Sequence, residues 1–63
     1  MEELLEYLGA RSSVCRTFVE MRYLNRRSDV QVAEALGLDS DEYQRTRRDA
    51  RDMIADYYAS KLR

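Results

Sequence analysis

The chain has 63 residues, of which 44% are hydrophobic and 37% are charged, and its formal net charge is −1. A chain of this length buries only roughly 60% of the surface that it exposes when unfolded, which excludes a second domain and a deep pocket for a small-molecule substrate. Because proline is absent and only two glycines occur, we predict a single all-α domain over residues 1–63.

The composition also predicts where the protein works and which chemistry it lacks. A single cysteine, Cys15, and the lack of an apolar run near the roughly 18–20 residues of a membrane span predict a cytoplasmic protein without a membrane segment. The acidic start, Met1-Glu2-Glu3, does not fit a signal peptide, and the initial methionine favours a complete small gene product. With no histidine and no glycine-rich phosphate loop, we expect no metal site, no cofactor and no enzymatic activity.

The first half of the chain predicts two helices. One side of the first helix, residues 2–8, carries three leucines: Leu4, Leu5 and Leu8. Gly9 suits the end of that helix. The second helix covers residues 12–24, and Ser12 or Ser13 provides its N-cap. The side chains expected on its buried face are Val14, Cys15, Phe18, Val19, Met21 and Leu24.

The third predicted helix is short and has clear signals at both ends. It covers residues 29–36, and Ser28 and Gln31 stand three apart, as a capping box requires. Gly37 is expected to stop the helix by taking a positive φ. The side chains expected to point inward are Val32, Ala33 and Leu36.

The fourth predicted helix is the longest and covers residues 40–61. Asp39 or Ser40 caps it, and Glu42 is placed for a second capping box. The side chains expected on its inward face are Tyr43, Ala50, Met53, Ile54 and Tyr57.

The spacing of apolar residues in this last helix allows two kinds of packing. Four residues follow one another at near-heptad spacing: Ala50, Ile54, Tyr57 and Lys61. A stripe with this spacing would suit a partner helix or a second copy of the chain. The alternative, which we favour, is that the helix packs on the leucines of the first helix. We therefore expect a monomer or a weak homodimer.

The string VAEALGL at residues 32–38 is the most specific motif of the chain. A helix-turn-helix needs a small residue where its two helices cross, and Ala33 supplies it. Gly37 follows four residues later, where the tight turn must form. Apolar Leu36 and Leu38 flank the turn, and Tyr43 returns an apolar side chain to the core. The string therefore predicts a helix-turn-helix built from the third and fourth helices.

Together with RTFVEMRYL at residues 16–24 and Ser28, this string resembles region 4 of bacterial sigma factors. It is also similar to small phage transcription regulators that share the pattern, and the resemblance spans residues 14–54. It implies a transcription regulator whose second motif helix enters the major groove of double-stranded DNA, with RNA polymerase as a further expected contact. The chain departs from the pattern at four positions: Asp39, Asp41, Glu42 and Thr46.

Two sets of residues are predicted to contact DNA. The resemblance implies that base edges are reached by Ser40, Asp41, Gln44, Arg45 and Arg48. A helical wheel with Tyr43 buried also turns the last three of these outward. Arginine can pair with guanine and glutamine with adenine through two hydrogen bonds each. Phosphate contacts are expected from side chains just before the motif or at the border of the wheel: Arg22, Arg26, Arg27, Ser28 and Arg51.

Other interpretations of the same residues remain open. Arg45 has acids four residues before and after it, and such pairs are ordinary surface stabilisers of a helix. The pI near 5.3 and the acidic start of the fourth helix favour a protein-interaction module that binds RNA polymerase or another regulator without reading DNA. A third hypothesis is a DNA-recognition domain of a phage packaging subunit.

Overall fold

A computed structural model describes residues 2–62 and shows, within them, helices and no strand. Helix α1 runs from Glu2–Arg11, α2 from Ser13–Val19, α3 from Asp29–Leu36 and α4 from Ser40–Lys61. A π-helical turn, η1, continues α2 over Glu20–Leu24. The protein is therefore a small all-α domain with four helices in its described residues, as the sequence predicts.

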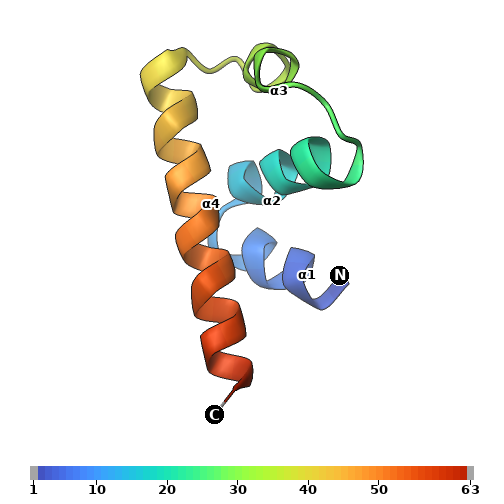
Figure 1. Ribbon diagram of the computed structural model, residues 1–63, viewed down its shortest axis with the longest axis vertical. Helices are drawn as coiled ribbons and strands as arrows, with labels where there is room; N and C mark the ends of the chain where they lie inside the picture. The colour runs from blue at the N-terminus through green and yellow to red at the C-terminus, as the bar shows by residue number, and fades with distance from the viewer. Residues whose placement is uncertain (1, 63) are drawn as a thin grey trace.

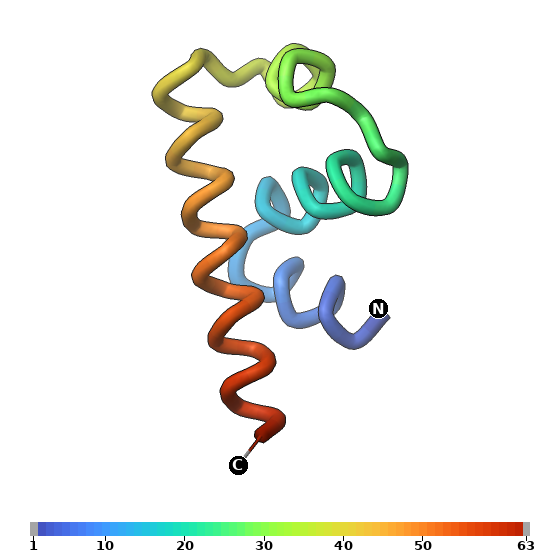
Figure 2. The backbone as a smooth tube through the Cα atoms, in the orientation of Figure 1, coloured from blue at the N-terminus to red at the C-terminus, as the bar shows by residue number. Residues whose placement is uncertain are grey.

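Helix α4 forms the long axis of the molecule, and the other helices lie on one side of it (Figures 1 and 2). α2 packs against both α1 and α4, and α1 also contacts α4. α3 lies beyond α2 and leads the chain back to the N-terminal end of α4 (Figure 1). The outer side of α4 is consequently left uncovered.

Helix α1 is longer than predicted, because Gly9 does not end it. The helix continues to Arg11, and the backbone N–H of Ser12 still donates to the carbonyl of Leu8 at 2.7 Å. Gly9 instead lies under the side chain of Arg16, whose Cδ would be 3.0 Å from an added Cβ. The glycine therefore serves a close approach between α1 and α2, and the helix stops where Ser12 caps α2.

The second predicted helix is correct in extent but not uniform in geometry. After Val19 the backbone widens into η1, and the N–H of Asn25 bonds to the carbonyl of Glu20 at 2.9 Å. Such a turn holds one extra residue and rotates the side chains that follow. Leu24, predicted to be buried, is 46% exposed for this reason. Val14 was also predicted to be buried, and this prediction is wrong, because the side chain is exposed.

Helices α3 and α4 begin and end as predicted. Ser28 and Gln31 form a reciprocal capping box at the start of α3, and Asp39 and Glu42 form a second at the start of α4. Gly37 ends α3 with φ 68° and ψ 33°, and the N–H of Leu38 donates to Ala33 at 2.9 Å. A short turn over residues 37–39 thus joins the two helices.

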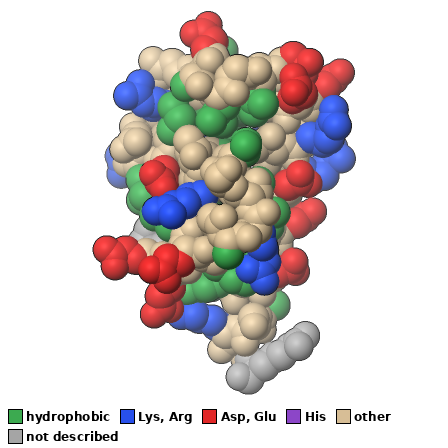
Figure 3. Space-filling view, turned by 180° about the vertical axis from the view of Figure 1, so that it is seen from behind, with side chains coloured by type: hydrophobic (Ala, Val, Ile, Leu, Met, Phe, Trp, Pro, Cys, Tyr) green, Lys and Arg blue, Asp and Glu red, His purple; other side chains and the backbone are tan. Residues whose placement is uncertain are grey.

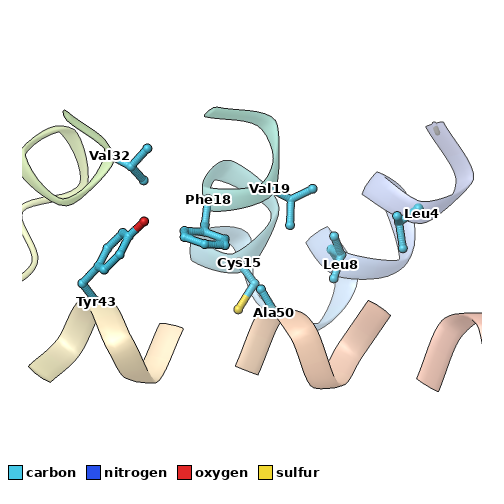
Figure 4. Close-up of a cluster of buried hydrophobic side chains, with 8 residues drawn as sticks. All are labelled: Leu4, Leu8, Cys15, Phe18, Val19, Val32, Tyr43 and Ala50. Carbon is cyan, nitrogen blue, oxygen red and sulfur yellow. The ribbon is translucent and has the colours of Figure 1, made fainter. Parts of the chain in front are cut away.

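The hydrophobic core lies where the helices meet beside α4 (Figure 4). Its buried members are Leu4, Leu8, Cys15, Phe18, Val19, Val32, Tyr43 and Ala50. Phe18 is the largest of the fully buried side chains, and its ring centroid lies 5.6 Å from that of Tyr43 at 63°. Edge-to-face aromatic pairs of this kind add about 0.5–1.5 kcal/mol beyond simple burial. Val32 is the one fully buried residue of α3, and Ala33 and Leu36 pack against the core as partly buried side chains.

Helix α1 closes against the last turns of α4. The rings of Tyr7 and Tyr57 are 5.2 Å apart, and Lys61 Nζ lies 2.6 Å from Glu3 Oε2. The Lys61 ammonium, as hydrogen-bond donor and as charge, lowers the pKa of the Glu3 carboxyl. The packing of α4 on the leucine-bearing first helix, which we favoured from the sequence, is confirmed. No helix in residues 2–62 is long and apolar enough for a bilayer crossing.

The left-handed conformation of Gly37 predicts that a side chain at this position lowers the stability of the protein. An added Cβ would meet nothing within 4 Å, so the cost of Gly37→Ala is conformational strain alone. We expect this change to lower the free energy of unfolding by about 1–2 kcal/mol, measured by urea denaturation. Gly37→Asn is the matched control, because asparagine adopts this conformation more readily, and it should recover part of the loss. Equal stability of Gly37→Ala and the native protein would contradict the prediction.

Candidate nucleic-acid interface

Four exposed arginines dominate the N-terminal half of α4: Arg45, Arg47, Arg48 and Arg51. The i, i+4 acids that could neutralise Arg45 and Arg48 do not do so. In the described residues, ion pairs form only at other basic groups, and no carboxylate lies at ion-pair distance from these four guanidinium groups. Residues 40–51 carry these four arginines against three acids, Asp41, Glu42 and Asp49, so this half of α4 has a small net positive charge although the whole chain is slightly acidic.

Three of these arginines share one side of the helix with a glutamine. A shallow hollow is lined by Gln44, Arg47, Arg48 and Arg51. We call this set the arginine face. Its spacing of i, i+3, i+4 and i+7 is that of one helix side. Gln44, Arg48 and Arg51 were predicted as contact residues, whereas Arg47 was missed. The i, i+3 spacing from Gln44 in the sequence indicates Arg47 as a further member of this side of the helix.

The remaining predicted base contacts lie around the arginine face. Arg45 borders a separate hollow, which Glu42, Thr46 and Asp49 also line. Asp41 is exposed in the first turn. Ser40 borders a different hollow, between α3 and α4, which Gln44 also lines. The structure thus gathers Gln44, Arg48 and Arg51 around one hollow, and Arg45 lines another.

Arg22, a predicted phosphate contact, is engaged within the protein. Its Nε lies 2.9 Å from Asp29 Oδ1, and its guanidinium also donates to the carbonyl of Arg27 at 3.4 Å. The Tyr43 hydroxyl donates to the same Asp29 oxygen at 2.5 Å. The pKa of the Asp29 carboxyl is lowered most by the hydrogen bond from this hydroxyl and next by the hydrogen bond from Arg22. The positive charge of Arg47 lowers it more weakly. Burial and the bond to Asp29 raise the pKa of Tyr43 to about 12.

The loop before α3 carries the other predicted phosphate contacts. Arg26 and Arg27 are exposed, and Arg26 has φ 53°, in the left-handed region that non-glycine residues rarely adopt. The backbone N–H of Arg27 donates to the carbonyl of Met21 at 3.0 Å, which holds the loop against η1. The Ser28 hydroxyl accepts from the N–H of Gln31 at 3.2 Å as the cap of α3.

The acidic start of α4 has a structural use. Asp39 accepts from the N–H of Glu42 at 2.8 Å, and Glu42 accepts from the N–H of Asp39 at 3.2 Å. The first of these bonds is the largest cause that lowers the pKa of Asp39. Carboxylates are also stabilised at this end by the helix dipole. Two of the three acids that depart from the sigma-like pattern therefore cap the helix, which leaves Asp41 alone without such a bond.

An apolar hollow lies between α3 and α4 beside the arginine face. Its apolar lining consists of Val30, Ala33, Leu38 and Tyr43, and its rim includes Asp29 and Glu34. Val30, at the edge of this hollow, is 67% exposed. On the side of the molecule seen in Figure 3, apolar side chains gather in the upper part while charges of both signs lie around them.

No cluster of three or more potential metal-ligating side chains occurs within residues 2–62. Comparison of the chain with models of known protein families, with curated proteins and with solved structures gave no match.

Proposed function

We propose that this protein is a DNA-binding transcription regulator that inserts the N-terminal half of α4 into the major groove. The observation that carries the proposal is the group of four exposed arginines on this half of α4 that form no ion pair among the described residues. Like charges at i, i+3 and i+4 destabilise a helix by about 0.2–0.5 kcal/mol per pair. An anionic partner such as duplex DNA would relieve that repulsion.

The shape of the molecule supports the same function. The major groove of B-DNA is about 12 Å wide and admits one α-helix. α4 is uncovered on its outer side (Figure 1), so no other helix would obstruct its entry. A short turn at Gly37 joins α3 to α4, and Val32 and Tyr43 of these helices are both buried; these features support a helix-turn-helix.

Within this proposal the residues have distinct roles. Gln44, Arg45 and Arg48 contact base edges, with Ser40 and Asp41 at the tip of the helix. Arg47 and Arg51, on the flank, bind the phosphates of one strand, and Arg26 and Arg27 bind phosphates from the loop before α3. The resemblance to sigma factor region 4 adds RNA polymerase as a second proposed partner.

Titration of labelled duplex DNA at several salt concentrations tests the proposal. The duplexes come from a randomised pool after rounds of enrichment by the protein, and a scrambled duplex is the control. Each neutralised phosphate contributes about 0.9 to the slope of log affinity against log salt, so four flank and loop arginines predict a slope magnitude of about 3 or more. A lack of binding at low salt would overturn the proposal.

A second candidate is a protein-interaction module that binds RNA polymerase or another regulator without reading DNA. The observation that favours it is the apolar hollow between α3 and α4, with exposed Val30 and an acidic rim. Apolar surface of this kind is typical of the centre of a protein interface. Val30→Ser would weaken such a complex and leave DNA binding unchanged. Replacement of the arginines of the arginine face would weaken DNA binding and leave the protein complex unchanged.

A further inference from the structure

Asp29 lies at one end of a continuous surface that leads to the arginine face. Its carboxylate is bound by Arg22 and by the Tyr43 hydroxyl. Asp29 and Gln44 line one hollow, and Gln44 lines the next hollow with Arg47 and Arg48. The surface from Arg22 to Arg48 is therefore contiguous, with a carboxylate near one end of it.

The groups around this carboxylate are those that bind a phosphate. Arg22 offers a guanidinium at 2.9 Å and Tyr43 a hydroxyl at 2.5 Å, both as donors to the same oxygen. Arg47 lies near enough to add a smaller charge effect on Asp29. Charge-assisted hydrogen bonds from arginine are the usual means by which proteins hold a phosphate oxygen. Two donors and a nearby positive charge thus converge on one anion.

The carboxylate can also leave. The Asp29 side chain is 60% exposed and the Arg22 side chain 39% exposed, so solvent and a ligand can reach both. Asp29 is the first residue of α3, where a rotated side chain would remain in water near the helix N-terminus. Exchange of this carboxylate for another anion therefore requires no rearrangement of the core.

We propose that Arg22 and Tyr43 form a phosphate-binding site that Asp29 occupies, and that in the native protein its carboxylate keeps a phosphate of duplex DNA out of this site. Asp29 is then an internal competitor that limits the affinity for DNA. The proposal rests on the DNA-binding function proposed above and adds to it one phosphate site and one residue that acts against binding.

Asp29→Asn tests this inference, because it removes the competing charge while keeping the size of the side chain. On the enriched duplex we expect affinity to rise about three- to tenfold and the salt slope to become steeper by about 0.9, the value of one added phosphate contact. Asp29→Glu keeps the charge and should bind as the native protein does. Asp56→Asn removes an exposed carboxylate elsewhere on α4 and should leave the slope unchanged.

A double-mutant cycle with Arg22 tests whether this guanidinium causes the gain in DNA affinity. Arg22→Gln should change DNA affinity less than twofold in the native protein, because Asp29 already occupies that guanidinium. In the Asp29→Asn background the same change should remove the gain and restore the native slope. This cycle remains informative even where Asp29→Asn has a lower stability, which circular dichroism would report.

The outcomes separate the inference from the function on which it rests. A native protein that binds the duplex, with an Asp29→Asn variant of equal affinity and slope, would overturn the internal competitor and leave the DNA-binding function standing. A gain in DNA affinity that persists when Arg22→Gln is added to Asp29→Asn would also overturn the role of Asp29 as a competitor, since Arg22 would not then hold the phosphate. Absence of DNA binding by the native protein and both variants would overturn function and inference together.

Discussion

Phe18→Ala is expected to leave much of the protein unfolded at room temperature. Phe18 is 1% exposed at the centre of the core, and truncation of such a phenylalanine typically costs about 3–5 kcal/mol. A domain of 63 residues has a free energy of unfolding of only about 3–9 kcal/mol, at 0.05–0.15 kcal/mol per residue. Urea denaturation followed by far-ultraviolet circular dichroism measures the loss.

Leu62→Ala is the control for that experiment. Leu62 is 87% exposed, so its truncation should change the free energy of unfolding by less than about 0.5 kcal/mol. A Phe18→Ala variant as stable as the Leu62→Ala variant would mean that Phe18 is not in the core of the folded protein.

Replacement of Arg47, Arg48 and Arg51 by glutamine is expected to abolish specific DNA binding without loss of stability. The change removes two proposed phosphate contacts, Arg47 and Arg51, and one proposed base contact, Arg48. The salt slope should therefore fall by about 1.8, and affinity for the enriched duplex by a hundredfold or more. Stability should stay equal or rise slightly, because repulsion between neighbouring guanidinium groups is removed. Fluorescence anisotropy and thermal denaturation give the two quantities.

The same three positions changed to lysine provide a matched control. Lysine keeps the positive charge but cannot form the paired hydrogen bonds of a guanidinium. This variant should therefore retain the salt slope and lose much of the discrimination between the enriched and the scrambled duplex. Native affinity and specificity in the glutamine variant would show that the arginine face does not bind DNA.

The extents of the helices in the second half of the chain could be predicted because their signals are local. Ser28 with Gln31, and Asp39 with Glu42, form their capping boxes through residues three apart. Gly37 has the positive φ that its place after Leu36 indicates. Each of these features depends on a few neighbouring residues, so a pattern in the sequence suffices to predict it.

Features that depend on contacts between distant residues could not be predicted in this way. The bond from Tyr43 to Asp29 joins residues 14 apart and exists only once the chain has turned at Gly37. The π-helical turn η1 has no signature in the residues that form it. Arg47 was missed because the helical wheel took Tyr43 alone as the buried direction. In the structure Arg47 is exposed and shares a hollow with Gln44, Arg48 and Arg51.

The contact between α1 and the end of α4 has a consequence for synthesis of the protein. Leu4 and Leu8 are synthesised well before Tyr57 and Lys61, the residues of α4 that contact α1 through a ring pair and an ion pair. The two leucines therefore lack their packing against α4 until its last turns have been made. Folding of the complete core must follow emergence of the last turns of α4, and a nascent chain stalled before them would present a leucine-rich surface to chaperones.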